Sequence, residues 1–192
     1  MRYSLFYLLL LFLFTSCSKQ YSSEKIGWKI TLPGRSWKAG SPKPNESSDV
    51  KTKQQVEKFL NLKMDGSRVQ EILTIRKNDL SSLVSVIETY DLPFDNGYEQ
   101  LLTEQHRKLK EDFKSKKIPA EYQIGASRIG GVMIDWYNIK TYDEPDKLPR
   151  LHTIFSCIRN NYIFSIVISS DNEKDFAVLE NVVYSSKFTT KE

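Results

Sequence analysis

The chain has 192 residues, 40% of them hydrophobic and 27% charged, and it carries a net charge of +4 at pH 7. This length is ample for a single domain that buries most of its apolar surface. Charges this evenly balanced exclude nucleic acid as the expected partner, because even the densest basic stretch, residues 107–117, also holds Glu111 and Asp112.

The N-terminus has the pattern of a secretory signal peptide over residues 1–16. A polar lead with Arg2 precedes ten apolar residues, Leu5 to Phe14, and the small residues Thr15 and Ser16 follow. As a helix, this apolar run would cover about 15 Å, half of a hydrocarbon core of about 30 Å. We therefore expect cleavage after Ser16. The alternatives are a membrane-inserted segment, or a plain signal peptide followed by an accidental cysteine.

The cysteine that follows lies in the stretch Phe14-Thr15-Ser16-Cys17, which resembles the lipobox of bacterial lipoproteins. There a large apolar residue, usually leucine, and two small residues precede an invariant cysteine. The resemblance implies that the thiol of Cys17 receives a diacylglyceryl group and that its amine can also be acylated, with fatty acids such as palmitate. Two or three acyl chains anchor a protein durably, since each buried CH₂ contributes about 0.8 kcal/mol. Ser18, in place of an aspartate, favours the outer over the inner membrane of the cell envelope.

The rest of the chain divides into a lipidated tether at residues 17–25, one domain at residues 26–188 and a polar tail at residues 189–192. The domain opens with a strand around residues 28–32, where apolar and polar residues alternate, and Pro33-Gly34 ends this strand.

Further apolar runs predict strands, and two segments with helical spacing predict helices. Asp65-Gly66 and Asn160-Asn161 mark tight turns between strand pairs. A strand cluster, a helix, a strand meander and a final helix indicate an α+β domain built on an antiparallel sheet. The expected strands span residues 60–64, 69–75, 83–90, 122–129, 132–142, 151–159 and 162–169, a loop spans residues 41–53, and the helices span residues 98–117 and 174–185. The expected buried face of the first helix holds Tyr98, Leu101, Leu102, Gln105, Leu109 and Phe113, and that of the second includes Phe176, Leu179, Val182 and Val183.

Four short motifs mark element boundaries: Trp28-Lys-Ile-Thr-Leu-Pro33 with Trp37 soon after, Tyr90-Asp91 before a helix, Ile129-Gly-Gly131 opening a strand, and the closing Tyr184-Ser-Ser-Lys-Phe188. Their order resembles the PsbP-like family, which includes small bacterial envelope lipoproteins. The resemblance implies an α/β/α sandwich, an antiparallel sheet flanked by helices, over nearly all of the mature chain. Family members are mostly non-catalytic binding or assembly factors, and the family has no active-site residues to carry over.

The side chains best suited to catalysis or metal binding have no partner residues at a suitable spacing in the sequence. His106 is expected on the polar side of the first helix and His152 at the start of a strand, and neither has a second histidine or cysteine at ligand spacing. Cys157 lies in an apolar strand without a histidine and acid signature, which indicates a buried, inert thiol. We therefore expect no catalytic residue, no metal and no cofactor.

The pattern Thr-Tyr-Asp-x-Pro occurs at two expected strand ends, residues 89–93 and 141–145. Turn chemistry accounts for it best, because Asp and Pro commonly end strands for local reasons. The alternative is a calcium site, since calcium prefers oxygen ligands. Its ligands would be Asp91, Asp95, Asp143 and Asp146.

The sequence thus predicts a lipid-anchored, non-enzymatic envelope protein that binds another protein or scaffolds an assembly, and that meets the membrane through Cys17. Trp37, just past a turn, is the one weak candidate for a binding residue, whereas Trp28 and Trp136 are expected in the core. The alternative is a small-ligand binder with a cleft at the sheet edge, and an enzyme ranks third. Since no disulfide is available once Cys17 is acylated, we expect a monomer that its core alone holds together.

We predict that Cys17→Ala leaves an unprocessed precursor, because diacylglyceryl transfer needs the thiol. Metabolic labelling with a fatty-acid analogue, followed by electrophoresis of the membrane fraction, checks this. Labelling that survives the substitution contradicts the assignment of Cys17 as the lipid-bearing residue.

Overall fold

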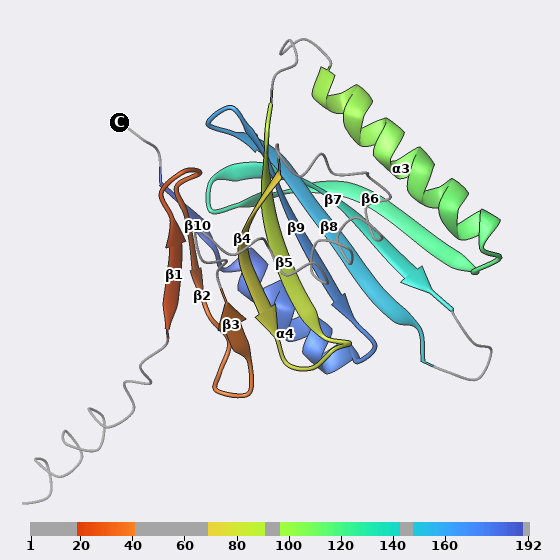
Figure 1. Cartoon of the computed structure of the whole chain (residues 1–192), viewed down its shortest axis with the longest axis horizontal. Helices are drawn as coiled ribbons and strands as arrows, with labels where there is room; N and C mark the ends of the chain where they lie inside the picture. Colours follow the sequence, from red (N-terminus) through yellow and green to blue (C-terminus); the bar gives the residue numbers. More distant parts are fainter. Residues whose placement is uncertain (1–18, 41–68, 91–96, 143–147, 190–192) are drawn as a thin grey trace, which may run out of the picture.

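The structure is a computed structural model, and it describes residues 19–40, 69–90, 97–142 and 148–189. Within these ranges the chain forms two antiparallel sheets and two helices (Figure 1). The elements are β1 (Gln20–Ser23), β2 (Trp28–Thr31), β3 (Lys38–Gly40), β4 (Val69–Arg76), β5 (Ser82–Thr89), α3 (Gly97–Ser115), β6 (Ala120–Ile129), β7 (Val132–Thr141), β8 (Arg150–Arg159), β9 (Tyr162–Ser170), α4 (Glu173–Tyr184) and β10 (Lys187–Phe188).

The larger sheet has the strand order β3-β4-β5-β9-β8-β7-β6, and the smaller one has the order β1-β2-β10. After β5 the chain leaves the sheet through α3, returns at the far edge as β6, and builds inward through β7 and β8 until β9 pairs with β5. β5 and β9 pair with each other in the interior of the sheet. Leu83 to Ile87 are buried without interruption, as a strand covered on both faces requires.

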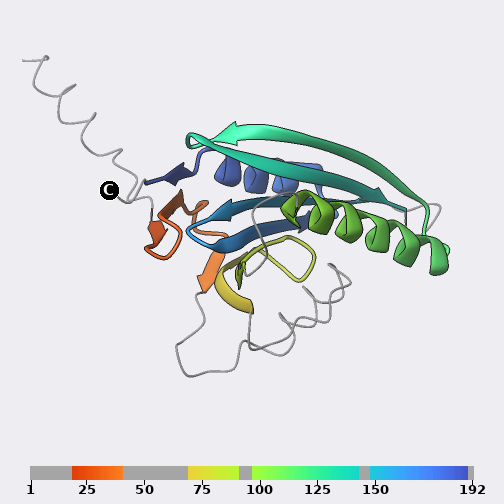
Figure 2. The ribbon, with the colours of Figure 1, turned by 90° about the horizontal axis from the view of Figure 1, so that it is seen from above.

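Alternate residues of the large sheet serve two separate cores. Leu83, Phe155 and Phe164 belong to the core on the side of α4, whereas Val84 and Val167 belong to a smaller core on the side of α3. The two helices therefore cover opposite faces of the sheet, as Figures 1 and 2 show. The fold is α+β, an antiparallel sheet flanked by helices, as the sequence predicted.

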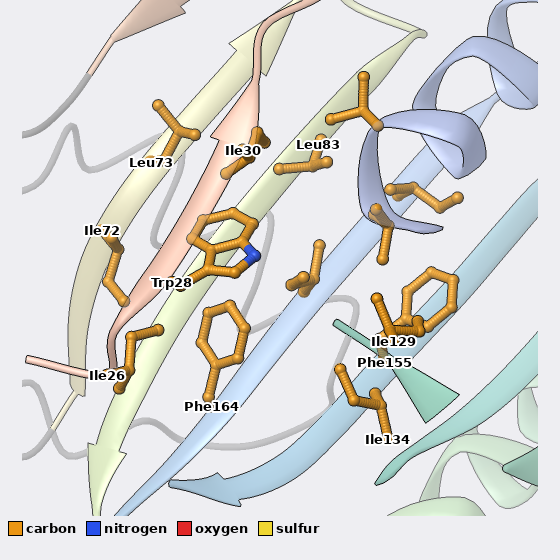
Figure 3. Packing of buried hydrophobic residues seen from close by; sticks show 14 of the residues in the cluster. Ile26, Trp28, Ile30, Ile72, Leu73, Leu83, Ile129, Ile134, Phe155 and Phe164 are labelled. Atoms are coloured by element: carbon orange, nitrogen blue, oxygen red, sulfur yellow. The ribbon is translucent and has the colours of Figure 1, made fainter. Parts of the chain in front are cut away.

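The small sheet closes the α4-side core by inserting Trp28. This side chain is fully buried, and its ring lies 5.0 Å from that of Phe164, centroid to centroid, at an angle of 57° (Figure 3). The ring of Tyr21 meets Trp28 edge-on at 6.3 Å, and the Tyr21 hydroxyl donates a hydrogen bond of 2.8 Å to the carbonyl of Ile72. The first and last strands of the described chain are thus joined to the large sheet by aromatic packing.

Most expected elements are confirmed to within a few residues at each end. Asn160 and Asn161 adopt φ values of 50° and 63°, which is the left-handed conformation that the expected tight turn needs. The expected loop at residues 41–53, the strand at residues 60–64 and the turn at Asp65-Gly66 lie outside the described residues.

The structure corrects the expected tether at residues 17–25. Residues 20–23 form β1, which pairs with β2 along its whole length, and Tyr21 packs against the core. The domain therefore begins by Gln20 rather than at Ile26. A four-residue strand with one aromatic residue carries too little periodicity to be recognised. The same holds for β3 and β10, which the sequence did not predict either.

The two helices also differ in how deeply they are packed. Leu179 of α4 is fully buried, as expected, but Phe113 of α3 is only half-buried, against expectation. A long helix that touches one edge of a sheet has fewer neighbours to cover its apolar stripe, and Leu109 is the fully buried residue of α3.

We predict that Leu179→Ala lowers the free energy of unfolding by about 2 to 5 kcal/mol, the usual cost of a cavity in a close-packed core. Phe113→Ala should cost clearly less, because its ring is already partly in solvent. Urea unfolding of the two variants side by side measures the difference. Equal losses would contradict the unequal packing of the two faces.

Candidate functional site

A small hollow lies at the interface between α3 and the strands β7 and β8, and both polar and apolar side chains line it. Its lining residues are Leu102, Gln105, His106, Leu109, Asp135, Trp136, Tyr137, Ile154 and Ser156. The enclosed space is about 10 Å³, which is room for the centre of a single water molecule. Pockets for small ligands are usually about 300 to 1,000 Å³. The hollow therefore does not match a small-ligand pocket.

A row of stacked rings borders this hollow. The ring of His106 lies on that of Tyr137, with centroids 4.0 Å apart and planes at 22°. Tyr137 stacks in turn on Tyr122 at 5.7 Å and 11°, and Tyr122 meets Phe113 at 6.4 Å. The Lys110 ammonium lies 5.4 Å from the centre of the Tyr122 ring, within reach of a cation–π interaction. The row links α3 to the β6–β7 hairpin.

His106 thus faces the sheet, which corrects its expected place on the polar side of the helix. Leu102, His106, Leu109 and Phe113 follow one another at spacings of four, three and four residues. This spacing was available in the sequence. The sequence analysis placed Gln105, and not His106, on the buried face. The two residues are neighbours at the border of that face, and only the contact of His106 with Tyr137 shows which of them meets the sheet.

The pKa values of two groups at this interface, His106 and Tyr98, are shifted toward their neutral forms. Burial lowers the pKa of His106, and the nearby Lys110 lowers it further, while Asp135 acts in the opposite direction. Burial, followed by the negative charge of Asp135, raises the pKa of Tyr98. The Tyr98 hydroxyl lies close to Asp135, yet the two groups do not meet the geometry of a regular hydrogen bond. The stacking of His106 on Tyr137 is a packing contact that joins α3 to the sheet.

His152 and Cys157 lie on opposite faces of β8, so they cannot form a catalytic pair. His152 is buried, and that burial, with a smaller effect of Arg150, lowers its pKa to about 3. Cys157 is a free, buried thiol, as expected. Its burial raises its pKa to about 12, so the reactive thiolate is absent at neutral pH.

Trp37, the weak binding candidate, lies on the α4 side of the sheet, away from α3. It is half-buried, and the Lys77 ammonium lies 6.0 Å from its ring centre. Lys77 also pairs with Asp175 of α4 at 2.7 Å, and Ser81 donates to the second carboxylate oxygen at 3.4 Å. The Ser81 hydroxyl is further bonded to that of Ser170 at 2.8 Å. These polar contacts join the β4–β5 turn to the first turn of α4, so their role is structural.

Several predicted features cannot be compared with the structure. Cys17 and the four carboxylates of the calcium alternative, Asp91, Asp95, Asp143 and Asp146, lie outside the described residues. Among the residues that are described, no three histidine, cysteine or acidic side chains gather as a metal site would require. Nor does any described helix have the length and apolar character to cross a membrane.

The β6–β7 hairpin exposes apolar side chains that the sequence analysis did not single out. Ile124 is 63% exposed and Met133 is 52% exposed. Both side chains point to the α3 side of the sheet, where Tyr137 is buried. Ile124 lies directly opposite Tyr137 in the register, and Met133 precedes Tyr137 by four residues in β7, so it lies on the same face. On the other side of the hairpin the indole of Trp136 covers Gly125, where a Cβ atom would lie only 2.3 Å from the ring. Trp136 is accordingly half-buried at the margin of the core.

No family model matches this chain, and no curated protein matches it. Among solved structures, the solution structure of cyanobacterial PsbP (CyanoP) from Synechocystis sp. PCC 6803 is similar, with a TM-score of 0.52 and 12% sequence identity. The similarity covers 89% of this chain and 92% of that chain. The domain therefore has a PsbP-like fold, as the boundary motifs predicted. At this level of identity the similarity establishes the fold alone.

We predict that the protein loses stability as the pH falls below 6.5. The pKa of His152 is about 3 in the folded protein, against 6.5 for an ordinary histidine. Between these two pH values His152 is protonated in the unfolded chain but neutral in the folded one. The stabilisation is complete above pH 6.5 and falls by up to about 1.4 kcal/mol per pH unit below it. Urea unfolding between pH 7 and pH 5 measures the slope, and His152→Gln should flatten it. A slope that this substitution leaves unchanged would show that other groups cause it.

Proposed function

We propose that this is a lipid-anchored, non-enzymatic envelope protein whose domain binds another protein through the exposed side of the β6–β7 hairpin. The observation that carries this proposal is the exposure of Ile124 and Met133 on one face of an edge hairpin. The two side chains lie on the same face of the hairpin, and exposed apolar side chains on one face favour an interaction site there. Cys17 provides the anchor, and the preceding lipobox-like residues support it; the outer membrane is the preferred location.

The backbone of β6 adds a second binding element to this surface. β6 is the last strand of the large sheet, and no described strand pairs with its outer edge. Its hairpin to β7 closes with Ile129 opposite Val132, so the register leaves the N–H and C=O groups of alternate residues, Tyr122 and Ile124 among them, pointing outward. A free edge of this kind accepts an additional strand from a partner.

Binding a small ligand, the alternative function, has less support. The hollow beside His106 admits no more than one water molecule. Enzymatic function has less still, because the interface groups best placed for proton transfer, His106 and Tyr98, have pKa values shifted toward their neutral forms.

We predict that Ile124→Glu with Met133→Glu lowers partner capture at least tenfold, because two charges would have to be desolvated at the interface. A photo-reactive amino acid at Tyr122 in the full-length protein, irradiated in intact membranes, provides the measurement. The probe at residue 122 is used both in the protein that keeps Ile124 and Met133 and in the double variant, so the amounts of captured partner can be compared directly.

Val178→Glu is the matched control, since Val178 is an exposed apolar residue of α4, 39% accessible, on the opposite side of the sheet. It should leave capture unchanged. Thermal melts should show that neither variant unfolds the domain. Equal loss in both variants, or capture unaffected by the double substitution, would contradict the proposed surface.

A further inference from the structure

Two lysines lie side by side on the outward face of the small sheet. Lys187 of β10 is directly opposite Lys29 of β2, and Ser22 of β1 is opposite Lys29 on the other side. Trp28, Ile30 and Phe188 point the other way, into the core. The outward residues form a surface that we call the basic face: Gln20, Ser22, Lys29, Thr31 and Lys187.

The charge of the basic face is not compensated locally. Like charges directly opposite each other on antiparallel strands destabilise a sheet. No ion pair joins Lys29 or Lys187 to an acidic side chain in the described part of the chain, and the other residues of the face are neutral. This repulsion is relieved when an anionic surface lies against both ammonium groups.

The position of β1 in the chain indicates which surface that is. β1 begins at Gln20, three residues after Cys17. A chain extends at most about 3.6 Å per residue, so lipid on Cys17 keeps the first residue of β1 within roughly 11 Å of the point where the acyl chains enter the membrane. That is close to a Debye length of about 8 Å at physiological ionic strength. The smaller sheet also lies at one end of the molecule, away from α3 (Figure 1).

We propose that the basic face docks on anionic phospholipid headgroups and so fixes the orientation of the domain on the membrane. The inference rests on the proposed lipid anchor at Cys17 and adds a second, electrostatic attachment to it. Lys29 and Lys187 supply the attraction, worth about fivefold in binding for each lysine near an anionic surface. In this orientation α3 points away from the membrane.

The test uses the full-length, lipid-modified protein in vesicles, with a fluorophore on Ser22→Cys. Cys17 carries its thioether and Cys157 is buried, so the label goes to residue 22. The vesicles contain a headgroup-attached quencher in phosphatidylcholine, with or without 30% phosphatidylglycerol. We expect at least twofold stronger quenching in the anionic vesicles, and loss of this difference in 0.5 M salt. A label on Thr103→Cys of α3 should stay unquenched in both.

Lys29→Gln with Lys187→Gln should remove the dependence on anionic lipid while raising the melting temperature, because the mutual repulsion is gone. Lys110→Gln with Lys114→Gln on α3 is the matched control with the same loss of charge, and it should keep the dependence. Quenching that is equal in both vesicle types, or that survives the first double substitution, overturns the docking.

Mass spectrometry of the mature chain separates this failure from that of the anchor. A chain without acyl mass contradicts the lipid anchor and the docking that rests on it. An acylated chain whose Ser22 label shows no dependence on anionic lipid contradicts the docking alone and leaves the anchor in place.

Discussion

The burial of Trp28 is the interaction on which the rest of the arrangement depends. Its indole fills the space between the small sheet and the large one and meets Phe164 at 5.0 Å, and Tyr21 covers it from β1. β2 holds β1 on one side and β10 on the other, so the contact of Trp28 with the large sheet supports both ends of the described chain. Without that contact the small sheet would have three short strands and too little apolar surface to stay folded by itself.

The two faces of the large sheet differ in the size of the core that they carry, and the proposed binding surface lies on the face with the smaller core. The α4 side carries the extensive core and the Lys77–Asp175 ion pair, whereas the α3 side carries a smaller core and half-buried rings. Surfaces that bind partners are commonly drawn from the less densely packed parts of a protein. The exposed side chains Ile124 and Met133 lie on this second face, beside a strand edge that is open among the described residues.

In the proposed arrangement, membrane attachment and partner binding lie at different ends of the domain. Trp28 holds the small sheet against the core, so Lys29 and Lys187 have a fixed direction relative to α3. A lipid on Cys17 alone would leave the domain free to rotate about a few residues of chain. Two lysines at the membrane surface, in the proposed arrangement, would restrict that rotation and present the β6–β7 hairpin consistently to a partner.

The sequence by itself determined the features that depend on local order. Alternating apolar residues predicted β2, and apolar runs between turn residues predicted β4, β5 and β6 to β9, because both signals are local properties of the sequence. The lipobox-like stretch before Cys17 is likewise a linear pattern. Only the tertiary structure showed that His106 stacks on Tyr137 and that Phe113 is half-buried. It also showed that residues 20–23 pair with β2 and that Lys29 lies opposite Lys187. A helix pattern does not fix which border residue meets the sheet, and strands of two to four residues are too short for a period. Contacts between distant segments arise from packing, which no local pattern contains.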